Sequence, residues 1–234
     1  MRSQSLKLLA AAALVGTFAG TAVASEMVVI DSKGMPIQSG TVIDGSKPVN
    51  LSAGTALTLL GADGSPVKLA GPYAGVPAKA GKAGDASTVN ALAALFQGQK
   101  KSTASLGAVR GAVASRELPD PWVVSVEDAG PRCIKEGGQV VLWRSDTKND
   151  ADIALTDGVR ATKPAKWPAG QDRVAGPQGF FSGGKSYTVT VDGKPRELQM
   201  IKVPEGQTNP AALAVWMSQQ GCKAQAVALL NTLK

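Results

Sequence analysis

The chain has 234 residues, of which 44% are hydrophobic and 18% are charged, and its formal net charge is +7. This balance excludes a disordered tail and a bundle of membrane-spanning helices. There is no histidine and there are only two cysteines, which excludes a Ser-His-Asp triad and any zinc or iron–sulfur site with four cysteine or histidine ligands. The composition therefore predicts no cofactor, no metal-ligating residues and no imidazole-based catalysis.

Residues 1–24 have the pattern of a signal peptide. Arg2 and Lys7 supply the positive charge, residues 8–15 form a short apolar core, and Ala22-Val-Ala24 is a small-x-small cleavage site. The apolar core is shorter than the roughly 20 residues that a spanning helix needs, so we favour a cleaved signal over a retained anchor. The mature protein is therefore expected to be exported and not membrane-spanning, with a periplasmic location favoured over secretion.

Export changes the interpretation of Cys133 and Cys222. In an oxidising compartment a cysteine pair is expected to form a disulfide, and only one intramolecular pairing exists. Buried free thiols and intermolecular pairing are the alternatives. The spacing is far too wide for a CxxC redox motif, so we predict a structural bridge.

Residues 25–78 are predicted to form a small all-β module. Short apolar runs end at the turn signals Asp31-Ser-Lys-Gly34, Asp44-Gly45 and Gly61-Ala-Asp-Gly-Ser65, and such turns between short runs are typical of β-hairpins. Around the last turn, leucine and valine alternate with Thr58 and Lys68. One face of this hairpin should therefore be buried, and Thr58 and Lys68 should lie on the other, solvent-exposed face.

The same segment carries a family resemblance. Residues 54–69, GTALTLLGADGSPVKL, followed by Gly71-Pro72, resemble the β-module of FecR-like envelope proteins. The resemblance implies a strand–turn–strand module over about a quarter of the chain and no catalytic residue. It does not imply the signalling role of that family, because this chain has no retained transmembrane helix or cytoplasmic arm. The region from Leu118 onward, with Val141-Leu-Trp143 and Trp167-Pro168, resembles a region of uncharacterised exported bacterial proteins.

Residues 79–117 are rich in alanine, glycine, serine and lysine, and we interpret them as a flexible linker. One short helix is predicted within the linker, starting near Asp85. Val89, Leu92, Ala93 and Phe96 then share one helical face.

The excess positive charge of the mature chain lies in this linker. Residues 79–116 contain six basic residues and one acidic residue, Asp85, so the rest of the mature protein is neutral. We interpret the linker charge as solubilising, and a weak electrostatic contact with an anionic envelope surface is the alternative. Nucleic acid is not expected as a partner, because the chain is exported and has no recognition motif. The basic residues are Lys79, Lys82, Lys100, Lys101, Arg110 and Arg116.

Residues 118–234 are predicted to form a disulfide-bridged α+β domain, so that the whole protein is mainly β with α. Strands are expected at residues 122–126, 139–144, 186–191 and 197–203, with an Asp192-Gly193 turn between the last two. A closing helical hairpin follows. Asn209 caps its first helix, Pro210 occupies the first helical position and Gly221 ends it. The second helix places Cys222 on its apolar face, so the disulfide should pin the hairpin onto the β-structure.

All four tryptophans lie in this last region. We interpret them first as core residues, and Trp122, Trp143 and Trp167 are also the candidate interaction surface of the domain. The predicted function is a non-enzymatic periplasmic binding or scaffold protein whose partner is another envelope protein.

Two other functions stay open. The first is a glycan-cleaving enzyme that uses carboxylates alone, for which Glu127, Asp128 and Glu136 are the candidates. The second is a calcium-stabilised binding module that uses the acidic loop at residues 146–157, although the loop spacing departs from that of an EF-hand. The oxygen donors of this loop are Asp146, Asn149, Asp150, Asp152 and Asp157.

Overall fold

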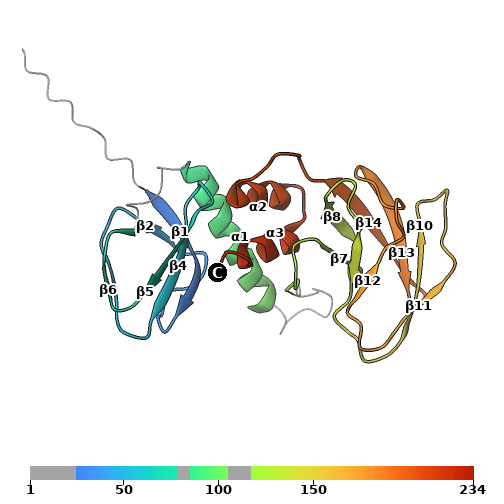
Figure 1. The fold of residues 1–234 in the computed structure, drawn as a ribbon, viewed down its shortest axis with the longest axis horizontal. Helices are drawn as coiled ribbons and strands as arrows, with labels where there is room; N and C mark the ends of the chain where they lie inside the picture. Colours follow the sequence, from blue (N-terminus) through green and yellow to red (C-terminus); the bar gives the residue numbers. More distant parts are fainter. Residues whose placement is uncertain (1–24, 78–84, 105–116) are drawn as a thin grey trace, which may run out of the picture.

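The computed structural model describes residues 25–77, 85–104 and 117–234. The predicted signal peptide lies outside the described residues, as do Lys79, Lys82, Arg110, Arg116 and the side chains of Lys100 and Lys101. The described part consists mainly of strands with three α-helices, which confirms the predicted class. Two β units lie at opposite ends of an elongated molecule, and the helices form a layer between them (Figure 1).

The N-terminal β unit contains a four-stranded antiparallel sheet in the order β2-β1-β4-β5 and a separate two-stranded ribbon of β3 and β6. The predicted hairpin is confirmed as β4–β5, with Leu57 opposite Leu69 and Leu59 opposite Val67. The strands are β1 (Glu26–Lys33), β2 (Val42–Asp44), β3 (Val49–Leu51), β4 (Ala56–Leu60), β5 (Pro66–Ala70) and β6 (Tyr73–Gly75).

Both faces of this sheet are covered. Along β1, Met27 and Val29 belong to the core of the β unit, whereas Val28 and Ile30 belong to the core of the helical layer. Lys68 is exposed as expected, but the prediction of a wet Thr58 was wrong, because Thr58 is buried. The sequence alternation is typical of a sheet with one solvated face, and the helices that cover the second face come from distant parts of the chain.

Helix α1 (Ala86–Ala104) is longer than the short helix expected from the sequence. Its predicted apolar face is confirmed, since Val89, Leu92, Ala93 and Phe96 are all buried. These side chains pack against β1 and against α2. The helix predicted within the linker is therefore a structural element whose apolar face completes a core, and most of the other linker residues lie outside the described residues.

Helices α2 (Pro210–Gln219) and α3 (Lys223–Asn231) form the predicted closing hairpin. The Asn209 side chain accepts hydrogen bonds from the N–H groups of Ala211 and Ala212 at 2.9 and 3.1 Å, and Pro210 follows at the first helical position. The amide of Asn209 also donates to the carbonyl of Ala62 at 3.0 Å. One capping residue thus joins α2 to the β4–β5 turn of the N-terminal β unit.

The C-terminal β unit is built from two sheets. One has the order β11-β10-β13-β14-β8 and the other β12-β9-β7, and both include a parallel pair, β14 with β8 and β7 with β9. The predicted turn between β13 and β14 is confirmed, with positive φ at both Asp192 and Gly193. The strands are β7 (Val123–Ser125), β8 (Gly130–Ile134), β9 (Val141–Trp143), β10 (Ala151–Thr156), β11 (Ala165–Trp167), β12 (Arg173–Ala175), β13 (Lys185–Val191) and β14 (Lys194–Lys202).

The predicted disulfide is confirmed. Cys133 in β8 and Cys222 at the start of α3 are joined with an S–S distance of 2.08 Å, and both residues are buried. The bridge fastens the helical layer to the C-terminal β unit.

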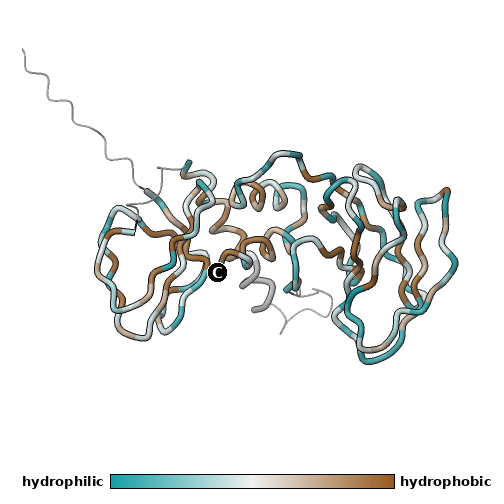
Figure 2. The backbone as a smooth tube through the Cα atoms, viewed as in Figure 1, coloured by the Kyte–Doolittle hydropathy of each residue, from teal (hydrophilic) through white to brown (hydrophobic). Residues whose placement is uncertain are grey.

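Figure 2 shows the hydrophobic residues concentrated in strands and helices of the interior and the hydrophilic ones along the outer loops. Among the described residues, none of the helices combines the length and hydrophobicity that crossing a membrane requires.

Candidate functional site

The expected interaction surface of three tryptophans is not an exposed surface. Trp167 is fully buried, and its indole N–H donates to the carbonyl of Gln171 at 3.0 Å. Trp143 is also buried, in a small cluster with Leu118 and Val123. Both large rings contribute more stability inside the β unit than on its surface, because burial removes their apolar area from water and the Trp167 N–H keeps a hydrogen bond. The prediction of an interaction surface is therefore wrong for these two residues.

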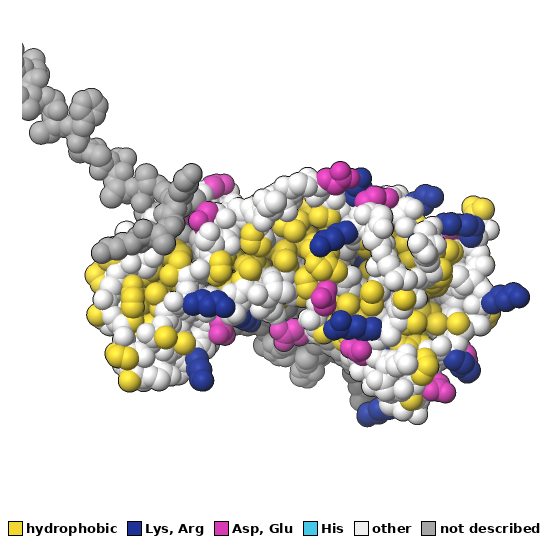
Figure 3. Space-filling model, viewed as in Figure 1, with side chains coloured by type: hydrophobic (Ala, Val, Ile, Leu, Met, Phe, Trp, Pro, Cys, Tyr) yellow, Lys and Arg dark blue, Asp and Glu magenta, His cyan; other side chains and the backbone are white. Residues whose placement is uncertain are grey.

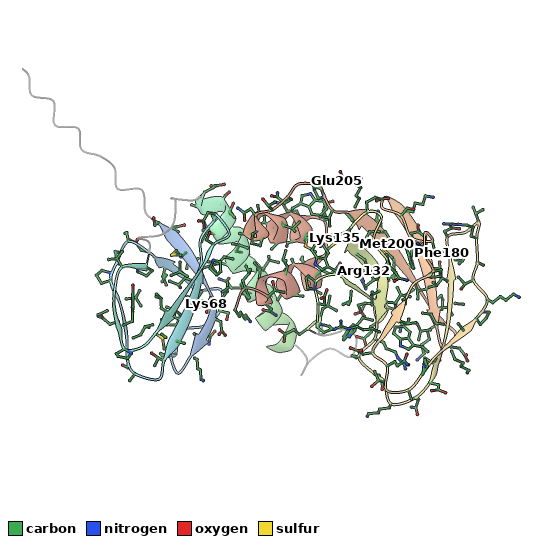
Figure 4. All side chains as sticks on the ribbon, in the orientation of Figure 1. Lys68, Arg132, Lys135, Phe180, Met200 and Glu205 are labelled. Atoms are coloured by element: carbon green, nitrogen blue, oxygen red, sulfur yellow. A yellow bond between two sulfur atoms is a disulfide. The ribbon has the colours of Figure 1, made fainter. Side chains whose placement is uncertain are left out.

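Trp122 differs from the other two because part of its ring stays accessible. The ring packs against the core of the helical layer, and the Lys135 ammonium lies 3.9 Å from the ring centroid. Trp216 of α2 is also only partly buried against this core. Figure 3 shows hydrophobic side chains gathered in the middle of the face on which Figure 4 labels Lys135. We call Trp122 with Lys135 the Trp122 patch.

A hollow of about 200 Å³ lies beside the disulfide, where β8 and the first turn of α3 meet the loop between β7 and β8. Its lining is mainly apolar and includes one half-cystine, Cys222. We call it the disulfide hollow. It is lined by Leu118, Ser125, Glu127, Asp128, Pro131, Arg132, Trp143, Gly221, Cys222, Lys223, Ala224 and Gln225.

A buried amide fixes one wall of the disulfide hollow. The side chain of Gln225 accepts a hydrogen bond from the N–H of Cys133 at 2.8 Å and donates to the carbonyl oxygens of Cys133 and Pro121 at 2.8 and 2.9 Å. Strand β8 is the edge strand of its sheet. Gln225 therefore satisfies backbone groups that an edge strand would otherwise leave unpaired in the interior.

Arg132 fixes the loop that forms another wall. Its guanidinium donates to the carbonyl oxygens of Ser125, Asp128 and Pro131 at 2.9, 2.6 and 2.9 Å. Burial lowers the pKa of Arg132 from its ordinary value, and the charge of Asp128 acts in the opposite direction. The side chain thus organises the β7–β8 loop through backbone contacts.

Two of the three carboxylates considered for glycan cleavage line one hollow, and the third lines another. Glu127 and Asp128 line the disulfide hollow, whereas Glu136 lines a separate hollow of about 380 Å³ formed with residues 177–179, 181 and 182. One oxygen of Glu127 accepts hydrogen bonds from the backbone N–H of Ser145, at 2.8 Å, and from its hydroxyl. Glu127 therefore ties the β7–β8 loop to the segment that follows β9.

The oxygen donors expected to form a calcium loop do not all meet in one place, because Asp146, Asn149 and Asp150 line one hollow and Asp152 and Asp157 do not. Asp150 accepts from the N–H of Ala169 at 2.7 Å, Asp152 forms an ion pair with Lys166 at 2.8 Å, and Asp157 forms one with Arg160 at 2.8 Å. Within the described ranges, no group of three or more cysteine, aspartate or glutamate side chains is placed to hold one metal ion. The expectation of a single loop at residues 146–157 is corrected, because residues 151–156 are strand β10 with alternate side chains in the core.

A second hollow of about 200 Å³ was not predicted from the sequence. We call it the charged hollow. Its two guanidinium groups are those of Arg144, at the end of an expected strand, and Arg196, directly before the start of another. Nothing local to either residue indicates that the two meet, because they come from different sheets. The lining is Val126, Glu127, Arg144, Asp146, Asn149, Asp150, Val191, Asp192 and Arg196.

Comparison of the chain with protein-family models, with curated proteins and with solved structures found no match.

Proposed function

We propose that the protein is a non-enzymatic periplasmic protein that binds or scaffolds another envelope protein through the Trp122 patch. The observation that carries this proposal is the partly exposed Trp122 ring with Lys135 lying 3.9 Å above it. Aromatic residues are enriched in protein interfaces and among the residues that dominate binding energy. An exposed lysine beside the ring allows charge to contribute to partner choice.

The backbone on both sides of the Trp122 patch is held in place, which favours binding without rearrangement. Trp122 directly follows Pro121, whose carbonyl is held by Gln225, and Lys135 lies two residues beyond the half-cystine Cys133. Because these anchors fix both sides of the patch, little conformational entropy is lost when a partner binds.

The chemistry of the neighbouring polar groups supports a non-enzymatic role. Glu127 and Arg132 hold loops in place, and Ser125 is buried with its hydroxyl accepting from the N–H of Glu127 at 3.3 Å. The disulfide is compatible with an extracytoplasmic location, because such bridges persist in oxidising compartments. The signal-peptide pattern and the resemblance to FecR-like envelope proteins favour the periplasm as that location.

Photo-crosslinking in intact cells tests this proposal. A photoreactive amino acid is placed at Lys135, and a matched protein carries it at Lys163, an exposed lysine between β10 and β11 in the C-terminal β unit. We expect a reproducible adduct with an envelope protein from position 135 and none from position 163. No adduct at position 135, or the same adducts from both positions, would contradict the proposal.

A further inference from the structure

The charged hollow has features that the proposed function does not use. It lies where the β7–β8 loop, the β9–β10 loop and the β13–β14 hairpin meet. Its volume of about 200 Å³ is below the roughly 300–1,000 Å³ of pockets for drug-sized ligands, so it suits a smaller molecule.

Arg144 is a buried cation without a counter-ion. Its side chain donates to the carbonyl oxygens of Gln171, Trp167 and Pro168 at 3.3, 3.2 and 2.8 Å, and its guanidinium carbon lies 5.0 Å from the centre of the Trp167 ring. Arg144 is only 7% exposed. Its Nη1 atom has no acceptor among the described residues, and no described carboxylate lies within 4.0 Å of the guanidinium. The carbonyl oxygens satisfy part of the guanidinium without neutralising its charge, so an anionic group near this residue would be stabilised by it.

Arg196 is held in a similar way. Its Nε donates to the carbonyl of Glu127 and its Nη1 to that of Lys194, which leaves Nη2 without an acceptor among the described residues. Carbonyl groups orient both guanidiniums but do not neutralise them. Two guanidiniums beside one hollow are suited to a carboxylate, because each offers planar N–H donors to its oxygens.

Three of the four acidic residues of the hollow are also fixed by the backbone, and the fourth, Glu127, accepts hydrogen bonds from Ser145. One oxygen each of Asp146, Asp150 and Asp192 accepts an N–H, from Lys148 at 3.1 Å, Ala169 at 2.7 Å and Asp152 at 2.8 Å respectively. None of these carboxylates forms an ion pair with Arg144 or Arg196 in the part of the chain that the structure describes. The three aspartates therefore line the same hollow as the two arginines without forming an ion pair with either.

We propose that the charged hollow binds a free α-amino acid. Its carboxylate would lie on the guanidiniums of Arg144 and Arg196, and its ammonium group would lie among the three aspartates. Val126 and Val191 provide apolar lining for the rest of the molecule.

The separation of charges favours a zwitterion over simpler ligands. A small anion would face the aspartates as well as the arginines, and a metal ion or amine would face the two guanidiniums. A ligand that carries both charges on neighbouring atoms complements both groups.

Isothermal titration calorimetry of the full chain tests the ligand class. The probes are L-alanine, L-lysine and L-glutamate at millimolar concentrations, each compared with its N-acetyl and its carboxamide derivative. We expect at least one amino acid to bind, with an affinity about tenfold or more above that of both derivatives, because each derivative removes one charge-assisted contact. The absence of binding by all three amino acids, or equal binding by the derivatives, would overturn the proposal.

Two variants test the position of the site. Asp192→Asn keeps an acceptor for the Asp152 N–H and tolerates the φ of +49° at this residue, while Arg196→Gln removes one guanidinium. We expect each to weaken binding about tenfold or more. Glu205→Gln and Arg173→Gln are matched controls outside the hollow, and near-UV circular dichroism checks that all four variants fold. Unchanged affinity in either hollow variant would overturn the assignment. Arg144 is kept intact because its hydrogen bonds support the fold around Trp167.

Discussion

The carboxamide of Gln225 hydrogen bonds to both backbone groups of Cys133, three residues along α3 from the half-cystine to which Cys133 is bonded. The N–H and C=O of one strand residue point to the same side of the strand. Gln225 therefore pairs the two groups that a further strand would pair at the open edge of β8. The disulfide and the amide thus fasten α3 to β8 at one residue.

Replacing Gln225 with leucine should destabilise the fold although the change is apolar and buried. The N–H and C=O of Cys133 and the carbonyl of Pro121 would lose their partner in the interior, at a total cost of about 3 kcal/mol. The free energy of unfolding from denaturant titration measures this loss. Gln219→Leu, at the exposed end of α2, is the control and should change stability by no more than about 0.5 kcal/mol. Equal effects of the two substitutions would show that the amide network contributes nothing.

The double variant Cys133→Ala with Cys222→Ala tests the disulfide. The bridge closes a loop with a sequence separation of 89, so its removal should lower the free energy of unfolding by about 4 kcal/mol. Denaturant unfolding of the oxidised protein and of the double variant gives the difference. The oxidised protein should also show no reactive thiol after denaturation without reductant, and two reactive thiols in that assay would refute the bridge.

Several features were predictable because their signals are local. The Asp192-Gly193 turn requires two residues with positive φ, and these two residues tolerate it. Asn209 and Pro210 together indicate the start of a helix, because asparagine favours the N-cap position and proline the first helical position. The disulfide was predictable because two cysteines allow one intramolecular pairing.

Other features depend on partners far away in the chain. The role of Gln225 depends on the backbone of Cys133, 92 residues earlier, and the sequence of α3 alone does not indicate this contact. The burial of Trp143 and Trp167, and the meeting of Arg144 with Arg196, depend on how the two sheets of the C-terminal unit face each other. The packing of α1 was missed because the alanine- and glycine-rich composition around it is typical of a linker, while its partner β1 lies some 60 residues away.

Asp157 should give the protein a pH-dependent contribution to stability. The backbone N–H of Arg160, the Arg160 side chain and the N–H of Val159 all hydrogen bond to this carboxylate, which lowers its pKa from 3.8 to about 2. A carboxyl whose pKa is depressed in the folded state stabilises it above the unfolded pKa, and this contribution is lost as the pH falls from about 4 to about 2. Asp157→Asn should therefore be less stable than the wild type near neutral pH, and the difference should shrink across that acidic range.

Unfolding free energies of both proteins between neutral pH and about pH 2 measure this effect. Arg160→Gln should have an intermediate effect, because it replaces the charged guanidinium with a neutral amide and keeps the backbone N–H, so the pKa of Asp157 should rise part of the way to its ordinary value. A stability difference that does not depend on pH would contradict this explanation.

Leu92→Ala should show that α1 belongs to the core. Leu92 is fully buried between β1 and the other helices, and its truncation should cost about 3 kcal/mol. Asn90→Ala, on the exposed side of the same helix, is the control. If α1 were a loosely attached linker helix, both substitutions would leave the stability of the protein within about 0.5 kcal/mol of the wild type.

The helical layer joins the two β units into one body, which is what a rigid binding surface at Trp122 requires. Ile30→Ala, in β1, tests whether the units unfold together, because all four tryptophans lie in residues 122–216 and their fluorescence reports only on the other side of the layer. We expect the substitution to lower the denaturant midpoint of the tryptophan fluorescence transition, in step with the circular dichroism transition. A fluorescence midpoint that stays at the wild-type value while the N-terminal unit unfolds earlier would contradict the claim.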